Sequence, residues 1–251
     1  MFLTNGESKP DLMTTSVTES DLPTGSLAAQ RLAGWSAVSS GVIGFIAYRF
    51  LIAYLNQRSV SPEDGDRMLR CHDGGVILQF LLLIPVVIGL QRFSMQRHPG
   101  LGRVIVVMGV GALCFVIILL LLVVPKIVWD VLYMFPQGLF GVWLMVVNGR
   151  MSGLLPRWLI GLGLVVGLGL MLVGTFPLGY GLLVDPTALR IPAVAPEELA
   201  FVSSPANTVL HQILFIGSYL GVAALPFWSV LIGWRLLRRG RGFLSVPRPT
   251  Q

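Results

Sequence analysis

Four polar side chains interrupt long apolar stretches, and their types could support chemistry. They are Arg49, Gln79, Asp130 and His211. A guanidinium, an amide, a carboxylate and an imidazole could form an ion pair, carry a proton or bind a polar ligand. An ionisable group inside a membrane span is costly unless it is paired, and it usually faces the bundle interior or a water-filled cavity. If the apolar stretches are membrane spans, we expect these four residues to form a polar site, with Arg49 paired to Asp130.

Six apolar stretches could position these side chains, each near the ~20 residues needed to cross about 30 Å of hydrocarbon. The predicted spans are about Leu32 to Leu55, Gly75 to Leu90, Val104 to Val124, Pro125 to Asn148, Trp158 to Phe176 and Thr208 to Ile232. Arg49 lies about six residues before the end of the first span, roughly 9 Å deep at 1.5 Å per residue. The other three side chains lie about one turn inside the second, fourth and sixth spans. In an alternating topology all four fall in one outer-leaflet layer.

Two simpler interpretations of these residues stay open. Arg49 could extend its guanidinium to the outer headgroups, beside Tyr48 and Tyr54. Asp130 and His211 could lie at the water boundary, because the edges of spans are uncertain by about two to four residues.

Composition indicates that lipid surrounds most of the chain. Of its 251 residues, 54% are hydrophobic and only 12% are charged, against about 25% charged in an ordinary soluble domain. The fold class we expect is all-α, a polytopic transmembrane bundle of six helices, with the lipid bilayer as its principal partner. The net charge of +6 is scattered between apolar runs, so it does not predict nucleic-acid binding.

Loop charge predicts the orientation of the bundle. Twelve basic residues lie in the N-terminal segment, the second and fourth loops and the C-terminal end, against five in the other loops. The positive-inside rule therefore places both termini in the cytoplasm. Residues 1–30 are polar and predict a disordered cytoplasmic tail. Residues 31–240 form the six-helix domain in this prediction, and residues 241–251 form a second cytoplasmic tail.

No catalytic residue, metal ligand set or cofactor is predicted. The chain lacks GxSxG, HExxH and Walker motifs, and its two cysteines have no metal-binding spacing. Cys71 is expected in a polar loop and Cys114 in the middle of a span, so we do not expect them to pair. A haem between His72 and His211 is the sharpest cofactor hypothesis. It is disfavoured because His72 falls in a polar CHDGG turn and no CxxCH motif is present.

Glycines in the fifth span predict a helix-packing face. At about 100° per residue, Gly163, Gly167 and Gly174 fall within about 40° of one another. Another helix could approach closely there, and it could belong to this chain or to another membrane subunit. The C-terminal run WRLLRRGRG, residues 234–242, could bind anionic lipid headgroups or act only as a topology anchor.

The segment Gly138 to Gly174 reads GLFGVWLMVVNGRMSGLLPRWLIGLGLVVGLGLMLVG. A span, a short Arg/Gly loop and an LPRW helix start follow one another, and this resembles the bacterial six-span membrane proteins grouped as domain of unknown function 4386. The resemblance implies an uncharacterised protein of the bacterial inner (plasma) membrane, with no catalytic residue to carry over.

Three classes of function remain. The first is a non-enzymatic scaffold, sensor or accessory subunit with a small outer-leaflet polar site. The second is a proton-coupled or small-molecule transporter, with Asp130 and His211 as proton carriers. The third is a membrane enzyme or redox protein that acts on a lipid-like substrate. The absence of catalytic motifs favours the first class. A continuous polar path from Asp130 towards Gln137 and Asn148 would favour the second.

Overall fold

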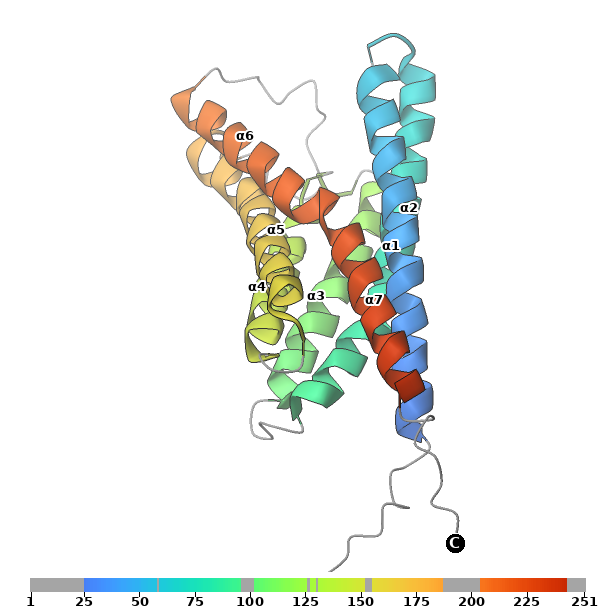
Figure 1. Cartoon of the computed structure of the whole chain (residues 1–251). Coiled ribbons are helices and arrows are strands. Elements are labelled where there is room, and N and C mark those ends of the chain that lie inside the picture. The colour runs from blue at the N-terminus through green and yellow to red at the C-terminus, as the bar shows by residue number, and fades with distance from the viewer. Residues whose placement is uncertain are drawn as a thin grey trace, which may run out of the picture.

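The computed structural model describes residues 25–57, 59–95, 102–125, 127–129, 131–151, 155–186 and 204–242. Within these ranges the regular elements are helices, without a strand (Figure 1). In chain order they are α1 Gly25–Gln57, α2 Pro62–Met95, α3 Gly102–Val123, α4 Met134–Arg150, α5 Arg157–Leu183, α6 Pro205–Gly217, the π-helix η4 Ser218–Ala223, and α7 Leu225–Gly242. The predicted all-α class is therefore confirmed.

Five helices are long and apolar enough to cross a membrane. They cover Ala28–Gln57, Pro62–Gln91, Arg103–Val123, Arg157–Leu183 and the continuous helical path Pro205–Arg238. α4 has 17 residues, or about 26 Å at 1.5 Å per residue, which is shorter than the other five. Large apolar side chains are exposed on every one of these helices, as expected where lipid is the solvent. The fold is thus that of a multi-pass membrane protein, with five candidate spans and one shorter helix.

The helices form two groups joined by α3. In the hairpin group, α1 packs against both α2 and α7; in the α5 group, α5 packs against α4, α6 and η4. α3 contacts α2 on one side and α4 on the other. α1 begins and α7 ends at the same end of the bundle, here called the proximal end (Figure 1). At the opposite, distal end, the α1–α2 hairpin and α6 diverge (Figure 1).

Aromatic packing ties the two groups together near the middle of the bundle. Phe140 of α4 stacks on Trp143 with ring centroids 5.2 Å apart and meets Phe80 of α2 edge-on at 6.3 Å. All three rings are buried. The indole of Trp143 also lies against Gly109 of α3, where a Cβ would come within 2.6 Å of its Nε1. Helices α2, α3 and α4 therefore meet around this stack.

Two helices, α1 and α2, begin well before the residues that the hydropathy pattern predicts. α2 begins at Pro62 instead of Gly75, because its polar first turns are helical and extend the hairpin towards the distal end. Glu63 and Asp64 lie in its first turn, where acidic side chains interact favourably with the helix dipole. α1 begins at Gly25, so residues 25–30 are helical; the rest of the predicted N-terminal tail lies outside the described residues.

α4 begins at Met134, later than the predicted start at Pro125. The residues before it form turns, with hydrogen bonds from Leu132 N to Trp129 O at 3.0 Å and from Met134 N to Val131 O at 3.0 Å. Pro136 consequently lies in the first turn of α4, where a missing N–H costs little. It therefore lies near the start of a helix and not in its middle.

The last helical path is bent at its π-helix. α6 and η4 pack against α5, whereas α7 packs against α1. The change of partner occurs over η4 and Pro226, the second residue of α7. A π-turn and a proline are both common causes of a bend within a helix. This path, α6–η4–α7, connects the α5 group to the hairpin group.

Candidate functional site

Gln79 is buried inside the hairpin group. It is 5% exposed, and the hydroxyl of Ser40 on α1 donates to its backbone carbonyl at 3.2 Å. Its side-chain amide lies so close to Gly44 that a Cβ there would come within 2.6 Å of Nε2 and 2.8 Å of the Pro226 ring. The Nε2 donor is buried without a hydrogen-bond partner. Gln79 is therefore enclosed by α1, α2 and α7 and does not face open space.

Arg49 lies on the exposed surface of α1. The ion pair found in the described part of the chain joins Arg67 and Asp64 at 3.9 Å, near the α1–α2 turn, and does not involve Arg49. This position matches the alternative in which the guanidinium reaches towards the headgroups.

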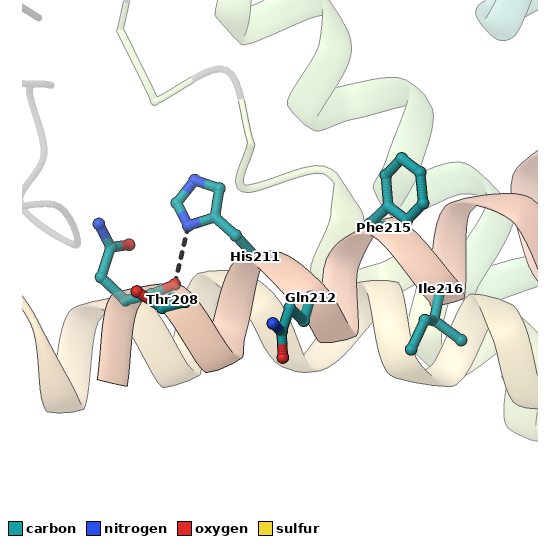
Figure 2. Close-up of a pocket in the computed structure, with 6 residues that line it drawn as sticks. Thr208, His211, Gln212, Phe215 and Ile216 are labelled. Atoms are coloured by element: carbon teal, nitrogen blue, oxygen red, sulfur yellow. Dashed lines mark hydrogen bonds between the residues drawn. The ribbon is translucent and has the colours of Figure 1, made fainter. Parts of the chain in front are cut away.

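His211 lies on the exposed surface of α6. Its Nδ1 donates to the carbonyl of Asn207, 2.9 Å away, one turn earlier (Figure 2). This bond requires the proton on Nδ1, so a neutral ring presents Nε2 as an acceptor. The ring also meets Phe176 of α5 edge-on, with centroids 5.5 Å apart. His211 is thus oriented by its own helix and by α5.

Asp130 lies outside the described residues, but its neighbours in sequence are placed. Trp129 and Val131 pack on a small apolar cluster around Phe176, Tyr180 and Leu210. The Trp129 and Tyr180 rings are 5.2 Å apart, and Tyr180 lies 5.9 Å from Phe176. Since Phe176 also contacts His211, Trp129 and Val131 meet the start of α6 at the same end of α5.

Two of the four residues of the predicted polar site, Gln79 and His211, lie in different helix groups. Gln79 is enclosed within the hairpin group, whereas His211 lies on α6 against α5. Equal depth along the spans does not predict that two side chains meet, because residues at the same depth can lie on opposite sides of a bundle. The Arg49–Asp130 pair stays a prediction.

A shallow groove of about 660 Å³ runs along α6 where His211 lies. Its lining is polar at the start of the helix and apolar further along: Asn207, Thr208, His211, Gln212, Phe215 and Ile216. Figure 2 shows His211 and Phe215 projecting from one side of α6 and Gln212 and Ile216 from another. Such a surface offers a hydrogen-bond acceptor and donors beside an aromatic ring. It suits binding of an amphipathic ligand or another helix better than covalent chemistry.

His72 is a buried polar residue that the sequence interpretation placed wrongly in a turn. It lies within α2, 5% exposed, and its Nδ1 donates to the carbonyl of Ala47 on α1 at 3.0 Å. The signal was present in the sequence, because His72, Val76, Gln79 and Leu83 repeat at helical spacing and are all buried. Cys71 beside it is exposed on α2 and does not lie in a loop.

The haem hypothesis finds no matching pair of histidines in the described ranges. His72 and His211 belong to different helix groups, and the hairpin and α6 diverge at the distal end (Figure 1). No group of three His, Cys, Asp or Glu side chains that could hold a metal ion occurs among the residues described.

The three glycines singled out in the fifth span lie against α4. A Cβ on Gly163 would meet the side chain of Asn148, one on Gly167 would come within 2.7 Å of Gly141 O, and one on Gly174 would come within 2.8 Å of Gly138 N. The partner on this face is thus a helix of the same chain. A second contact was missed: Gly169, on another face of α5, lies against the backbone of Gly221 in η4.

No family model matches the chain, and neither a curated protein nor a solved structure matches it. The resemblance of the Gly138–Gly174 segment therefore stays a prediction.

Proposed function

We propose that this chain is a non-enzymatic integral membrane component, a sensor or accessory subunit, whose bent helix α6–η4–α7 couples the two helix groups. One observation carries this proposal: a continuous helical path packs on α5 in its first part and on α1 in its second. Backbone contact of Gly221 with Gly169 fixes the first part, and contact of Gly41 with Pro226 and Val230 fixes the second. A displacement of α6 at the distal end would therefore be passed to α1 and α7.

The surface that receives the partner or ligand in this proposal is the α6 groove. Phe215 is 63% exposed and Ile216 is 52% exposed, beside polar Thr208 and Gln212. A helix that combines exposed polar and aromatic side chains near its start suits an interfacial contact better than a purely lipid-facing wall.

The α4–α5 seam argues against a transport path between Gln137 and Asn148. Both side chains are buried on α4. Between them, Gly141 lies against the backbone of Gly167 and Met171, so the helices touch without intervening side chains. The Asn148 amide donates to Leu144 O in its own helix at 2.9 Å. A transporter would have to separate α4 from α5 to pass a solute here.

The membrane assigned in this proposal is the bacterial inner membrane, with both termini cytoplasmic. It rests on the distribution of arginines and on the LPRW resemblance. The common end of α1 and α7 supports an even number of crossings.

Reconstitution into proteoliposomes tests the proposal against transport. With a pH-sensitive dye inside, we expect a proton flux equal to that of protein-free liposomes, and no change on His211→Ala. A flux above this background that is lost in His211→Ala or Asp130→Asn would overturn the non-transporting role.

The same protein, extracted with its lipids into polymer discs, tests the accessory role. We expect a membrane partner of fixed stoichiometry that is lost on Phe215→Ala. Phe115→Ala on α3 is the matched control, because that ring is also exposed, at 41%, but lies far from the groove in sequence and on another helix. Equal loss in both variants would contradict the assignment to α6.

A further inference from the structure

The proximal end of the α1–α7 pair carries two Arg–Trp turns. On α1, Arg31 and Trp35 are one turn apart, and on α7, Trp234 and Arg238 are one turn apart. Both arginines are exposed; Trp35 is 60% exposed and Trp234 45%. Residues at this spacing lie on one side of a helix. Each helix thus presents one guanidinium and one indole to its surroundings.

The contacts between the two antiparallel helices put these turns at the same level. Gln30 Nε2 donates to Leu236 O at 3.0 Å. Gly34 lies opposite Gly233 and Leu237, where a Cβ would come within 3.2 Å of Gly233 O. Arg31 is therefore level with Arg238, and Trp35 is level with Trp234.

The two turns also lie on the same side of the helix pair. The inward flank of α1, with Ala33, Ser40 and Ala47, packs on α2, and the inward flank of α7 is buried at Ser229 and Ile232. Because both buried flanks face the interior of the bundle, the exposed flanks of α1 and α7 lie together on the outer side of the helix pair. About two turns deeper on this flank of α7, Phe227 meets Phe45 of α1 edge-on, with ring centroids 4.6 Å apart.

The charge of this face is not neutralised by described acidic residues. Those acids are Glu63, Asp64, Asp66 and Asp73, in the first half of α2, and Asp185, just after α5. The start of α2 and the end of α5 both lie at the distal end (Figure 1). At the proximal end, the Arg238 guanidinium lies 3.9 Å from the centroid of the Trp234 ring, which holds it in place without cancelling its charge. In the part of the chain that the structure describes, these two arginines have no carboxylate partner, so the face is open to an anionic ligand.

The order of side chains with depth identifies the class of anion. Two arginines come first, then two indoles, and then the exposed apolar side chains Val42, Ile46 and Phe227. A guanidinium binds phosphate through two parallel hydrogen bonds, and tryptophan favours the headgroup level of a bilayer. We propose that the Arg31–Trp35 and Trp234–Arg238 turns together bind one anionic phospholipid, with its phosphate between the arginines and an acyl chain along Val42 and Phe227. A soluble phosphate would leave the apolar side chains without a role.

Native mass spectrometry of the full chain with bound lipid tests this site. The protein is released from bilayers that contain equal amounts of phosphatidylglycerol and phosphatidylcholine. We expect one retained phosphatidylglycerol and a roughly fivefold loss of its occupancy ratio for each arginine replaced, in Arg31→Gln and Arg238→Gln. The matched control is Arg103→Gln with Arg157→Gln, which removes two exposed charges at the proximal starts of α3 and α5. We expect less than about a twofold change there.

The lysine variants Arg31→Lys and Arg238→Lys keep the charge but lose the planar fork, so we expect intermediate retention. The thermal unfolding temperature of each variant is measured as well. A variant that loses lipid but unfolds at the same temperature as the parent has lost binding and not folding. Equal retention of phosphatidylglycerol by the glutamine variants and the parent would overturn the proposal. An equal loss of phosphatidylglycerol in the control pair, or equal retention of phosphatidylcholine, would also overturn it. The same holds if the parent retains a protein instead of a lipid and the glutamine variants release that protein.

Discussion

Gln79 is a buried polar side chain enclosed by the hairpin group. Its backbone carbonyl accepts the Ser40 hydroxyl at 3.2 Å, whereas its side-chain Nε2 is buried without a partner next to Gly44. A buried donor that makes no hydrogen bond costs about 1–3 kcal/mol. The backbone carbonyl of Gln79 thus stabilises the fold through its hydrogen bond, whereas the unpaired side-chain donor destabilises it.

Two substitutions separate these effects. Gln79→Met keeps the length of the side chain and removes the unpaired donor, so we expect the free energy of unfolding to rise by about 1 kcal/mol or more. Ser40→Ala removes one interhelical hydrogen bond and should lower it by about 0.6 kcal/mol. Thermal unfolding in a mild detergent measures both. If Gln79→Met is the more destabilising of the two, Nε2 has a partner in the membrane, and the account of this residue is wrong.

The sequence indicated which residues are unusual but not which of them meet. Depth along each helix can be counted from hydropathy, and it placed Gln79 and His211 in one layer. The lateral position of a helix depends on side-chain packing across the whole bundle, which no single stretch encodes. His72 shows the complementary failure, because a polar local sequence concealed a buried helical position that the 72, 76, 79, 83 spacing indicates.

Among the elements, α5 is the one whose packing face could be predicted from its sequence. Gly163, Gly167 and Gly174 face α4, and Gly169 faces η4. Small residues let helix backbones approach closely, and this is a main source of association energy when lipid surrounds the helices. The packing face could be predicted from spacing alone, whereas the identity of the partner helix could not.

A pair of glycine variants tests this arrangement. In Gly174→Ala, the new Cβ would come within 2.8 Å of Gly138 N and 3.1 Å of Met134 O, and backbone cannot move aside easily. We expect a loss of about 1–3 kcal/mol in unfolding free energy. Gly161→Ala is the matched control on the same helix, because nothing lies within 4 Å of its Cβ. There alanine should stabilise the helix by up to about 1 kcal/mol. The same thermal response in both variants would contradict the packing at this seam.

The starts of α2 and α4 show the limit of hydropathy for elements. The first turns of α2 are polar and the turns before α4 are apolar, so average hydropathy excludes the former from a helix and includes the latter. Hydrogen bonding decides both cases. Ser61 and the acidic first turn favour helix at Pro62, and Pro125 and short-range turns delay α4 until Met134.

At the scale of the whole molecule, two helix groups are joined by α3 and by one bent helix, α6–η4–α7. Composition alone predicted a helical membrane bundle, because only 12% of the residues are charged. It could not predict the division into groups, which follows from contacts between residues far apart in sequence, such as Gly41 with Val230 and Gly169 with Gly221. Composition also does not decide the number of membrane crossings, which depends on whether α4, the 17-residue helix, spans the bilayer.

The central claim is that the chain is a multi-pass membrane bundle in which α4 also crosses the bilayer. Sidedness labelling tests it most directly. In a variant with Cys71 and Cys114 replaced by serine, single cysteines are placed at two exposed positions, Val124 just after α3 and Arg157 at the start of α5. A membrane-impermeant maleimide is then added to intact cells and to permeabilised cells. If α4 crosses the bilayer, the Val124→Cys protein is labelled in intact cells and the Arg157→Cys protein only after permeabilisation. Labelling of both from the same side would show that α4 does not cross, and it would contradict the bundle described above.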